Sequence, residues 1–480
     1  MNKYLLITLV FLTAFCCSEV YSQNSDIKRT THWYFGVKAG IDFSSGTAVA
    51  DTNGKLTSLQ GMSTMSDTSG NLLFYTDGKT VWNAQHDSMP NGTGIGVGHN
   101  ATPVKGVVIV PKPMNNSIYY ILVVDGWEHQ FLNGLRYSIV DMTLDSGRGS
   151  VTQKNILLFG PTTEQLGVIK DATGCGYWIL SHERYSDKFR SYHLTNNGID
   201  TNAVITAIAP DYGYMASFSI YAGGAGITFS PNGNLFGTID WWGWRNGTGI
   251  PDSTSLYHFD RNTGIVSNKI TLDIDTMTFA IGISPDNTKL YLYEGYNLAK
   301  LYQYDISNYS SISIQSSKTF IHAGNDLPTD YRQGIDGKLH GCSELRLYLS
   351  TIHNPNASGQ ACNFVKNNTS LGGRTGLMEL PNFVESFFDS SSACVTSVNE
   401  IENSGIHIYP NIAREWIVVE GNDFEQVRLV DITGRLVYLT SPHNVSLDHI
   451  RINVSSYPRG IYIVSVISQN KSVNRRIILY

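Results

Sequence analysis

The chain has 480 residues and is mildly acidic, with 34 lysine and arginine residues against 40 aspartate and glutamate residues and a formal net charge of −6. This balance argues against nucleic-acid binding, which needs a basic face. Only 15% of the residues are charged, whereas glycine (45 residues) and tyrosine (27 residues) are abundant. With plentiful Thr, Ser and Ile, this composition is typical of strands and tight turns, so we expect an all-β protein.

The first 22 residues have the features of a secretory signal peptide. Lys3 precedes a short apolar run, and residues 20–22 (VYS) place small or short side chains where a signal peptidase reads them, so we expect cleavage after Ser22. Acylation at Cys16 or Cys17 is the alternative, but neither cysteine follows a small residue. No later stretch reaches the ~20 apolar residues of a membrane helix, so we expect no transmembrane segment.

Four cysteines remain after this leader, at positions 175, 342, 362 and 394. In an oxidising compartment an even number suggests disulfide bonds, and four cysteines allow three pairings. A bond between Cys342 and Cys362 would close the shortest loop and is the favoured pairing. The sequence has no C-x-x-C pair, which excludes a cysteine zinc site.

A repeated pattern fills the middle of the chain. An Asp, Asn, Pro or Gly turn precedes a short apolar or aromatic strand in six segments, which are 66–78 (SDTSGNLLFYTDG), 113–125, 170–183, 230–242, 284–295 and 334–344. Each segment is followed by a partner strand such as KTVWN, GLRYSIVDM or KLYQYDIS. Successive copies start roughly fifty residues apart, which is typical of solenoids and propellers.

Two further strand-rich segments, WYFGVKAGIDF near the start and TGLMELPNFVESFF near the end, have no complete copy of their own. A seventh blade built from both ends would close the ring and remove exposed sheet edges. We therefore predict a seven-bladed β-propeller over residues 23–388, with six or eight blades as the alternatives.

WYFG, AGIDFSSG, SDTSGNLLFYTDGKTVWN, MPNG, VIVPKP and YYILVVD occur in this order over the first third of the chain, with His86 just before MPNG. This series resembles a large group of surface propeller proteins from gliding, type IX-secreting diderm bacteria. The resemblance covers nearly the whole predicted propeller and implies architecture and location rather than an activity.

The C-terminal residues predict a second, smaller domain. Residues 389–404 are small and polar, as in a linker. Residues 405–480 contain strands of about five residues separated by turn residues, such as IHIYPN, WIVVEG and IYIVSVIS. This spacing predicts a small Ig-like antiparallel β-sandwich.

The sandwich resembles the type A C-terminal sorting domain of the type IX secretion system. The residues that carry the resemblance are Tyr409, Pro410, Asn411, Asp431, Gly434, Arg435, Pro458, Gly460 and Tyr462. The sequence departs from the pattern at Ile412, where the family usually repeats Pro, and in its terminal IILY, which lacks the usual closing Lys.

This resemblance implies periplasmic transit, recognition of the module by the outer-membrane translocon, and then its removal or attachment to surface lipopolysaccharide. The mature protein would be secreted or held on the outer face of the outer membrane. An ordinary adhesive Ig-like domain is the alternative, because small sandwiches host many functions.

No standard catalytic motif occurs in the sequence, and no cofactor is expected. His182 and Glu183 end a predicted strand, and Glu128 and His129 form a similar pair. Adjacent strand residues point to opposite faces, so these side chains are more readily explained as hydrogen-bonded blade residues than as an acid–base pair. Facing carboxylates over the central channel would instead suggest glycoside cleavage.

The segment DWWGWRNGTG offers a ligand-binding loop. Its candidate residues are Asp240, Trp241, Trp242, Trp244 and Arg245. Their rings could stack on sugars or on a protein, but propellers also bury tryptophan between blades. Exposed rings would indicate binding.

The Asp- and Asn-rich turns lack the ligand series of a calcium loop, so tight-turn chemistry explains them and no metal is expected. Asp87-Ser88-Met89 and Asp275-Thr276-Met277 fit a short O-glycosylation pattern of the same bacterial group, although a plain loop explains them equally well.

Taken together, these features predict a non-catalytic surface platform for an extracellular glycan or protein. A polysaccharide hydrolase or lyase with its site at the central channel is the first alternative, and an accessory of the secretion or gliding machinery is the second.

Overall fold

The computed structural model describes residues 25–96, 105–126, 129, 131–209, 225–240, 253–272, 278–295, 299–325, 327–389, 394, 406–424, 426–431, 435–440, 447–468 and 471–480. The chain divides into two compact units, residues 1–393 and 394–480, which are described separately below. No described helix is long and apolar enough to cross a membrane.

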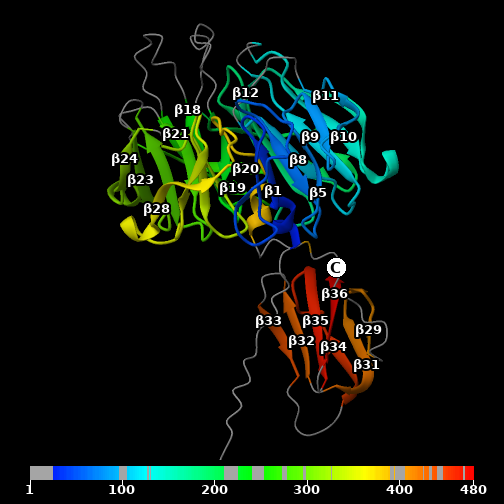
Figure 1. Ribbon diagram of the computed structural model, residues 1–480. Coiled ribbons are helices and arrows are strands. Elements are labelled where there is room, and N and C mark those ends of the chain that lie inside the picture. The colour runs from blue at the N-terminus through cyan, green and yellow to red at the C-terminus, as the bar shows by residue number, and fades with distance from the viewer. Residues whose placement is uncertain are drawn as a thin grey trace, which may run out of the picture. The chain divides into compact units, whose positions relative to one another are not determined.

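The first unit is a seven-bladed β-propeller (Figure 1), as predicted. Blade 1 contains β1 (His32–Phe35), β2 (Ala39–Asp42) and β3 (Val49–Ala50). Blade 2 contains β4 (Ser63–Ser66), β5 (Leu72–Thr76), β6 (Thr80–Asn83) and β7 (Ser88–Thr93), and blade 3 contains β8 (Val107–Pro111), β9 (Ile118–Val123), β10 (Leu135–Asp141) and β11 (Ser150–Phe159). Blade 4 contains β12 (Thr162–Lys170), β13 (Tyr177–Glu183), β14 (Lys188–Thr195), β15 (Gly198–Ile199) and β16 (Val204–Ala207).

The remaining blades follow the same meander. Blade 5 contains β17 (Ala225–Phe229), β18 (Leu235–Asp240), β19 (Ser253–Asp260) and β20 (Ile265–Leu272). Blade 6 contains β21 (Thr278–Ile283), β22 (Lys289–Glu294), β23 (Ala299–Asp305) and β24 (Thr319–Gly324), and blade 7 contains β25 (Asp330–Gln333), β26 (Leu339–Cys342), β27 (Tyr348–Ile352) and β28 (Phe364–Ser370). Short helices are η1 (Ser25–Thr30), η3 (Asp145–Gly147), α1 (Ser311–Ser316), η6 (Gly359–Cys362) and η7 (Glu385–Phe388).

Each predicted repeat corresponds to the first turn of a blade and its second strand. In the turn between β4 and β5, the Asp67 carboxylate accepts the backbone N–H groups of Ser69 (2.8 Å) and Asn71 (2.9 Å). Asn115 and Asp286 accept turn N–H groups in the same way in blades 3 and 6. These side chains therefore close their own turns, which is why Asp and Asn recur at these positions.

The direction of the strands defines two faces of the propeller. The inner strands β4, β8, β12, β17, β21 and β25 contact one another in chain order around the ring. The described connections from second to third strands therefore leave the face opposite to the Asp and Asn turns. We call this the loop face; its described connections include residues 184–187 and 343–347, and also residues 36–38 between β1 and β2, because β1 runs antiparallel to β4.

Blade 1 closes the ring in a way that differs in part from the prediction. Its three described strands all come from the N-terminal segment. β1 runs antiparallel to β4, because the Tyr34 N–H donates to Thr64 Oγ1 (3.3 Å) while His32 Nδ1 lies 3.1 Å from Ser66 Oγ. The C-terminal residues 375–388 do not form its fourth strand. They run irregularly through the middle of the ring, and their described strand-like pairings are three single bridges, between Val37 and Thr375, between Arg346 and Gly376, and between Ser63 and Asn382.

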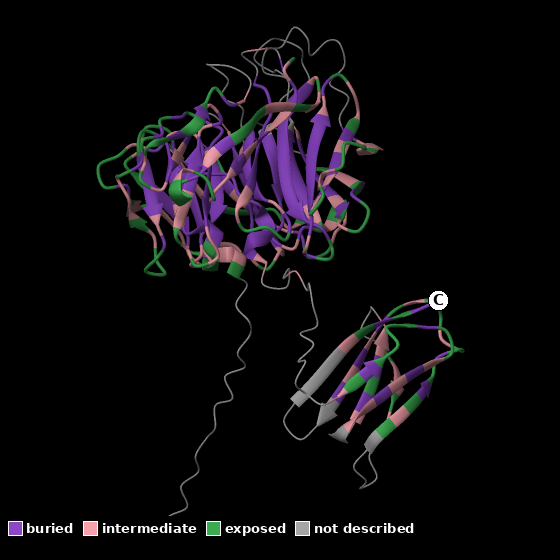
Figure 2. Cartoon of the chain, turned by 90° about the vertical axis from the view of Figure 1, so that its right-hand side faces the viewer, coloured by how far each residue is buried: buried purple, intermediate pink, exposed green. Residues whose placement is uncertain are grey.

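Most residues of the inner strands of the propeller are buried, as the purple ribbons in Figure 2 show. Trp33 of blade 1 is fully buried, and its ring lies 5.0 Å from Phe43 and 6.1 Å from Phe383 of the C-terminal segment. Burying an aromatic side chain of this kind stabilises a fold by about 1.5–3 kcal/mol. Aromatic packing therefore joins the two ends of the propeller sequence.

The favoured disulfide pairing is wrong. Cys342 and Cys362 are free and buried, whereas Cys175 and Cys394 are both disulfide-bonded. Cys342 packs in the hydrophobic cluster around Trp33, and Cys362 packs in a different cluster around Tyr331. Loop length could not reveal this separation, because it is the blades that place the two cysteines in different cores.

The second unit is the predicted small sandwich. One sheet contains β29 (His407–Tyr409), β31 (Trp416–Phe424) and β34 (Leu447–Asn453), and the other contains β30 (Ile412–Ala413), β36 (Lys471–Leu479), β35 (Gly460–Ser468), β32 (Gln426–Asp431) and β33 (Leu436–Leu439). Its core includes Ile417, Val419, Leu429, Val464 and Ile477. All described pairings are antiparallel except that of β30 with β36, which is parallel.

The ring closure predicts a specific sensitivity at Gly36. Gly36 has φ +58°, and a Cβ atom there would overlap the carbonyl oxygen of Thr375, whereas Gly46 has φ +83° and open space around it. We expect Gly46→Ala to cost about 1 kcal/mol through backbone strain alone. Gly36→Ala should cost about 2–4 kcal/mol, because the C-terminal segment must also move. Urea unfolding of the full chain measures both, and equal costs would contradict this closure.

Candidate functional site

Of the candidate residues predicted from the sequence, His182 and Glu183 end β13 and His129 follows β9, so these three belong to the loop face. Glu128, Trp241, Trp242, Trp244 and Arg245 lie outside the described residues, as does the side chain of Asp240, the last residue of β18.

His182 and Glu183 are held by different partners. His182 is fully buried; its Nε2 lies 3.0 Å from the carbonyl oxygen of Ser186, and burial lowers its pKa to about 3. The imidazole is therefore neutral at physiological pH and is not poised for proton transfer. Glu183 pairs with Arg190 on the next strand at 2.7 Å.

His129 is paired within its own connection. Its Nδ1 lies 3.0 Å from the carboxylate of Asp125, which is fully buried and also accepts the Asn133 N–H (2.8 Å). Nearby, the Arg184 guanidinium lies 4.0 Å from the centre of the Phe131 ring. These contacts stabilise the connections after β9 and β13, and none of them joins His129 to His182 in one acid–base centre.

The middle of the ring contains a buried charge cluster that the sequence analysis missed. Lys105, just before β8, donates from Nζ to Thr228 Oγ1 in blade 5 (2.7 Å) and pairs with Asp330 in blade 7 (3.0 Å). Its backbone N–H donates to Glu379 in the C-terminal segment (3.0 Å). One residue thus connects three blades and the segment that passes between them.

Arg332 connects the same segment to blade 7. Its guanidinium pairs with Glu385 and donates to Asn382 Oδ1 (2.8 Å), and it is almost fully buried. The Asn382 amide in turn donates to the Lys105 carbonyl (2.8 Å). Asp330 accepts the Leu380 N–H (3.1 Å), so the charged groups also satisfy the backbone of the irregular segment.

A second set of ion pairs lies at the end of this segment that contains Ser386. Lys170 at the end of β12 pairs with Asp26 of η1 at 2.6 Å, and its backbone N–H donates to Ser386 Oγ (3.0 Å). Arg29 also pairs with Asp26 (2.8 Å). The N-terminal and C-terminal ends of the propeller therefore meet at one ion-paired contact.

Burial raises the pKa of Glu379 to about 7, and the nearby charge of Asp330 raises it further. N–H donors from Gly61 and Lys105 oppose this shift but do not cancel it. Burial also raises the pKa of Glu385, against the lowering effect of Arg332. Burial thus disfavours the charged forms of Glu379 and Glu385. Each carboxyl group nevertheless has partners within the protein, the Gly61 N–H for Glu379 and the Arg332 guanidinium for Glu385.

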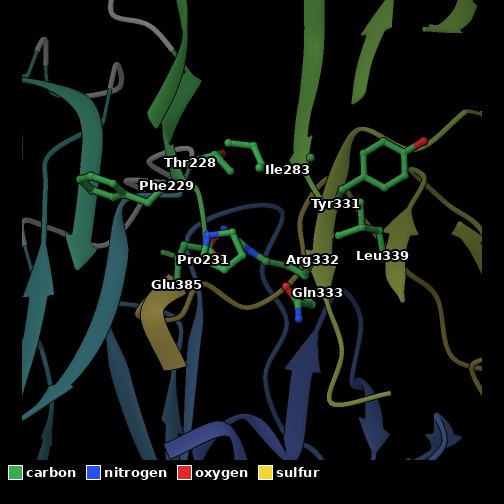
Figure 3. Close-up of a pocket in the computed structure, with 10 residues that line it drawn as sticks. Thr228, Phe229, Pro231, Ile283, Tyr331, Arg332, Gln333, Leu339 and Glu385 are labelled. Atoms are coloured by element: carbon green, nitrogen blue, oxygen red, sulfur yellow. The ribbon is translucent and has the colours of Figure 1, made fainter. Parts of the chain in front are cut away.

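A small cavity lies beside this cluster. Its lining includes Thr228, Ile283, Arg332, Gln333 and Glu385, and Figure 3 shows Arg332 extending from β25 toward Glu385. Its volume is about 10 Å³, roughly the space of one water molecule. This cavity is too small for a sugar ring, and the Glu379 and Glu385 carboxyl groups in the ring centre are bonded to backbone N–H groups and to Arg332.

The sequence held a weak signal for this cluster. Asp330 and Arg332 alternate in a short inner strand, and Glu379 and Glu385 stand in an otherwise apolar segment. Charged residues that are buried are almost always paired. The pattern could have indicated a buried network, but only the ring shows which charges meet.

The loop face carries an exposed apolar strip over blades 7 and 1. It consists of Val37, Leu59, Leu345, Leu347 and Tyr348, which are 39%, 37%, 66%, 45% and 45% exposed. Single bridges join their segments side by side, pairing Arg346 with Gly376, Thr375 with Val37, and Val37 with Thr57. Leu345 has φ +57°, an unfavourable conformation for leucine.

Residues 407–480 match the Secretion system C-terminal sorting domain. This match confirms the resemblance of the sandwich to a type IX sorting module. The protein is exported by the type IX system to the cell surface or the medium, and its C-terminal module interacts with that system. No curated protein matches the sequence significantly.

The chain is similar to several solved structures. These include a putative 6-phosphogluconolactonase from Bacteroides uniformis (TM-score 0.38, 12% identity, 82% of this chain and 98% of that chain) and the β-propeller domain of Cps50 (Swd1) from Myceliophteria thermophila (0.38, 10%, 66% and 94%). A functionally unknown protein from Desulfotomaculum acetoxidans is another (0.35, 14%, 79% and 94%). At these scores the likenesses carry no inference about function.

The charge cluster predicts a strong effect at Arg332. Arg332→Met leaves Glu385 and Asp330 buried without this cation, and we expect a loss of about 3–5 kcal/mol in the free energy of unfolding. The matched control is Arg148→Met, because Arg148 forms an exposed pair with Asp145 at 2.8 Å. That change should cost less than about 1 kcal/mol. Similar losses in urea unfolding would show that the central pair is not structural.

Glu379 predicts a pH dependence of stability. Because its pKa is raised in the folded protein, its contribution is fully present below pH 4.5 and is lost as the pH rises through about 7. Glutamine has no such titration, and its side-chain oxygen can accept the same N–H groups. Between pH 4.5 and pH 7.5, the free energy of unfolding of Glu379→Gln should therefore rise by about 3 kcal/mol relative to that of the native protein. Parallel stability curves over this range would contradict the raised pKa.

Proposed function

We propose that the exported propeller is a non-catalytic platform that binds an extracellular protein through the apolar strip on its loop face. The strip carries this proposal, because contiguous exposed apolar side chains on a folded protein commonly mark interaction surfaces. Leu345 has a strained backbone conformation although 66% of its surface is exposed, so packing in the core does not explain the strain.

The chemistry of the strip favours a protein over a glycan. Its exposed members are mainly aliphatic, whereas glycan sites use aromatic platforms with surrounding polar groups. Lys38 and Arg374 are exposed in the bridged segments, together with Glu344. A protein surface with apolar side chains and a largely acidic rim would complement this arrangement.

The ring centre supports a non-catalytic role. Its carboxylates are bonded to Lys105, Arg332 and backbone N–H groups, and the adjoining cavity has room for about one water molecule. Glycoside cleavage needs two carboxyl groups flanking a bound sugar, which this space does not accommodate.

The test is site-specific photo-crosslinking on cells that produce the full chain. A photoreactive residue at Tyr348 should form a covalent adduct with a protein partner, and Leu345→Asp/Leu347→Asp should reduce that adduct at least about tenfold. The matched controls are a photoreactive residue at Ile205 and the variant Ile205→Asp/Ile265→Asp. Ile205 and Ile265 are similarly exposed, at 50% and 45%, on outer strands of blades 4 and 5.

Three results would count against the proposal. Equal yields of adduct with the photoreactive residue at positions 348 and 205 would show that the strip is not the binding surface. An adduct that chemical deglycosylation abolishes would favour a glycan ligand. Release of sugars from cell-surface polysaccharide by the purified chain would show that the propeller is catalytic and would overturn the proposal.

A further inference from the structure

The outer face of the five-stranded sheet in the sandwich is unusually apolar. One face of a two-sheet sandwich normally packs on the core while the other is solvated and polar. Here Ile412, Leu436, Leu439, Ile461 and Ile478 are 56%, 48%, 44%, 42% and 36% exposed. They come from β30, β33, β35 and β36.

The strand register places these side chains next to one another. Ile478 pairs with Ile412 on one side and with Ile461 on the other, so the three isoleucines form one row across three strands. In the next row, Ile463 pairs with Val430, and Val430 pairs with Leu436. Paired residues share a face of the sheet, so the two rows form a continuous apolar surface, here called the sandwich strip.

The sandwich strip is bordered by positive charge. Arg476 pairs with Ile463, and Arg428 pairs with Leu439. Both arginines are exposed, and they are the charged residues among the outward-pointing side chains described on these strands. The Asp431 carboxylate is bonded to Arg435 at the hairpin, at 3.0 Å.

The three-stranded sheet provides an internal comparison. On its outer face the Arg451 guanidinium lies 4.2 Å from the centre of the Trp416 ring, and His449 lies 3.2 Å from the Glu420 carboxylate. Polar and aromatic groups there contact one another, as on an ordinary solvated surface. The two faces of the same module thus differ in chemistry.

We propose that the sandwich strip is the surface by which the secretion machinery holds this module during export. The match of residues 407–480 to a sorting domain identifies that machinery as a partner. The exposed isoleucines and flanking arginines indicate the chemistry of the contact, an apolar groove with a carboxylate rim. This inference does not depend on the function proposed for the propeller.

The test follows export of the full chain in a type IX-secreting bacterium. Ile461→Asp/Ile478→Asp should reduce the amount at the cell surface and in the medium at least about tenfold, with accumulation in the periplasm. Arg428→Glu/Arg476→Glu should lower export at least about threefold, because it places carboxylates against the proposed acidic rim. Ile205→Asp/Ile265→Asp in the propeller and Arg451→Glu on the other sheet are the matched controls and should leave export unchanged.

The thermal midpoint of each purified full-length variant separates docking from folding. Normal export of the folded strip variants would overturn the proposal, and so would equal losses in the control variants. If Ile461→Asp/Ile478→Asp unfolds the module, the test rests on Arg428→Glu/Arg476→Glu, because both arginines are exposed. Normal export of that arginine variant would then contradict the proposal. Sedimentation that shows a native dimer lost in the strip variants would assign the surface to a second copy of the chain instead.

Discussion

The closure of the propeller depends on buried charges that meet in the middle of the ring. Blade 1 has three strands among the described residues, and an irregular segment that forms no ladder of backbone hydrogen bonds there takes the place of an inner strand. Lys105, Asp330 and Arg332 supply the missing partners to this segment. Buried ion pairs of this kind contribute little net stability, but removing one partner is costly. The network therefore specifies one arrangement of the chain ends more than it stabilises the blades.

This closure also occupies the acidic groups in the ring centre. Acidic side chains do converge in the centre, which is the arrangement expected of a hydrolase, but each is occupied by a cation or by backbone N–H groups. The described cavity beside them holds about one water molecule. Away from the ring centre, the loop face exposes the strip of aliphatic side chains over blades 7 and 1 that we propose as the binding surface. The rigid ring holds this strip at fixed positions, which lowers the entropic cost of binding.

Each of the two units presents an apolar strip on its surface. The sandwich strip belongs to a module that matches a sorting domain, so the partner that we propose for it is part of the export route. The strip on the loop face belongs to the unit that is delivered. Basic residues lie beside both surfaces, although the chain as a whole is acidic and Glu344 also lies beside the strip on the loop face.

The sequence by itself determined the all-β class, the seven blades and the sorting module, because turn residues and strand alternation are local signals that repeat at a regular spacing. Asp67 and its equivalents could be recognised as turn residues, since the atoms they bond lie within a few positions. The roles of Lys105, Glu379 and Arg332 could not, because their partners are up to 318 residues away. The same holds for Cys342 and Cys362, which the blades place in separate cores, and for the isoleucines of the sandwich strip, which only the strand register aligns. Contacts between distant residues exist only once the ring and the sandwich have formed, so tertiary structure alone decided them.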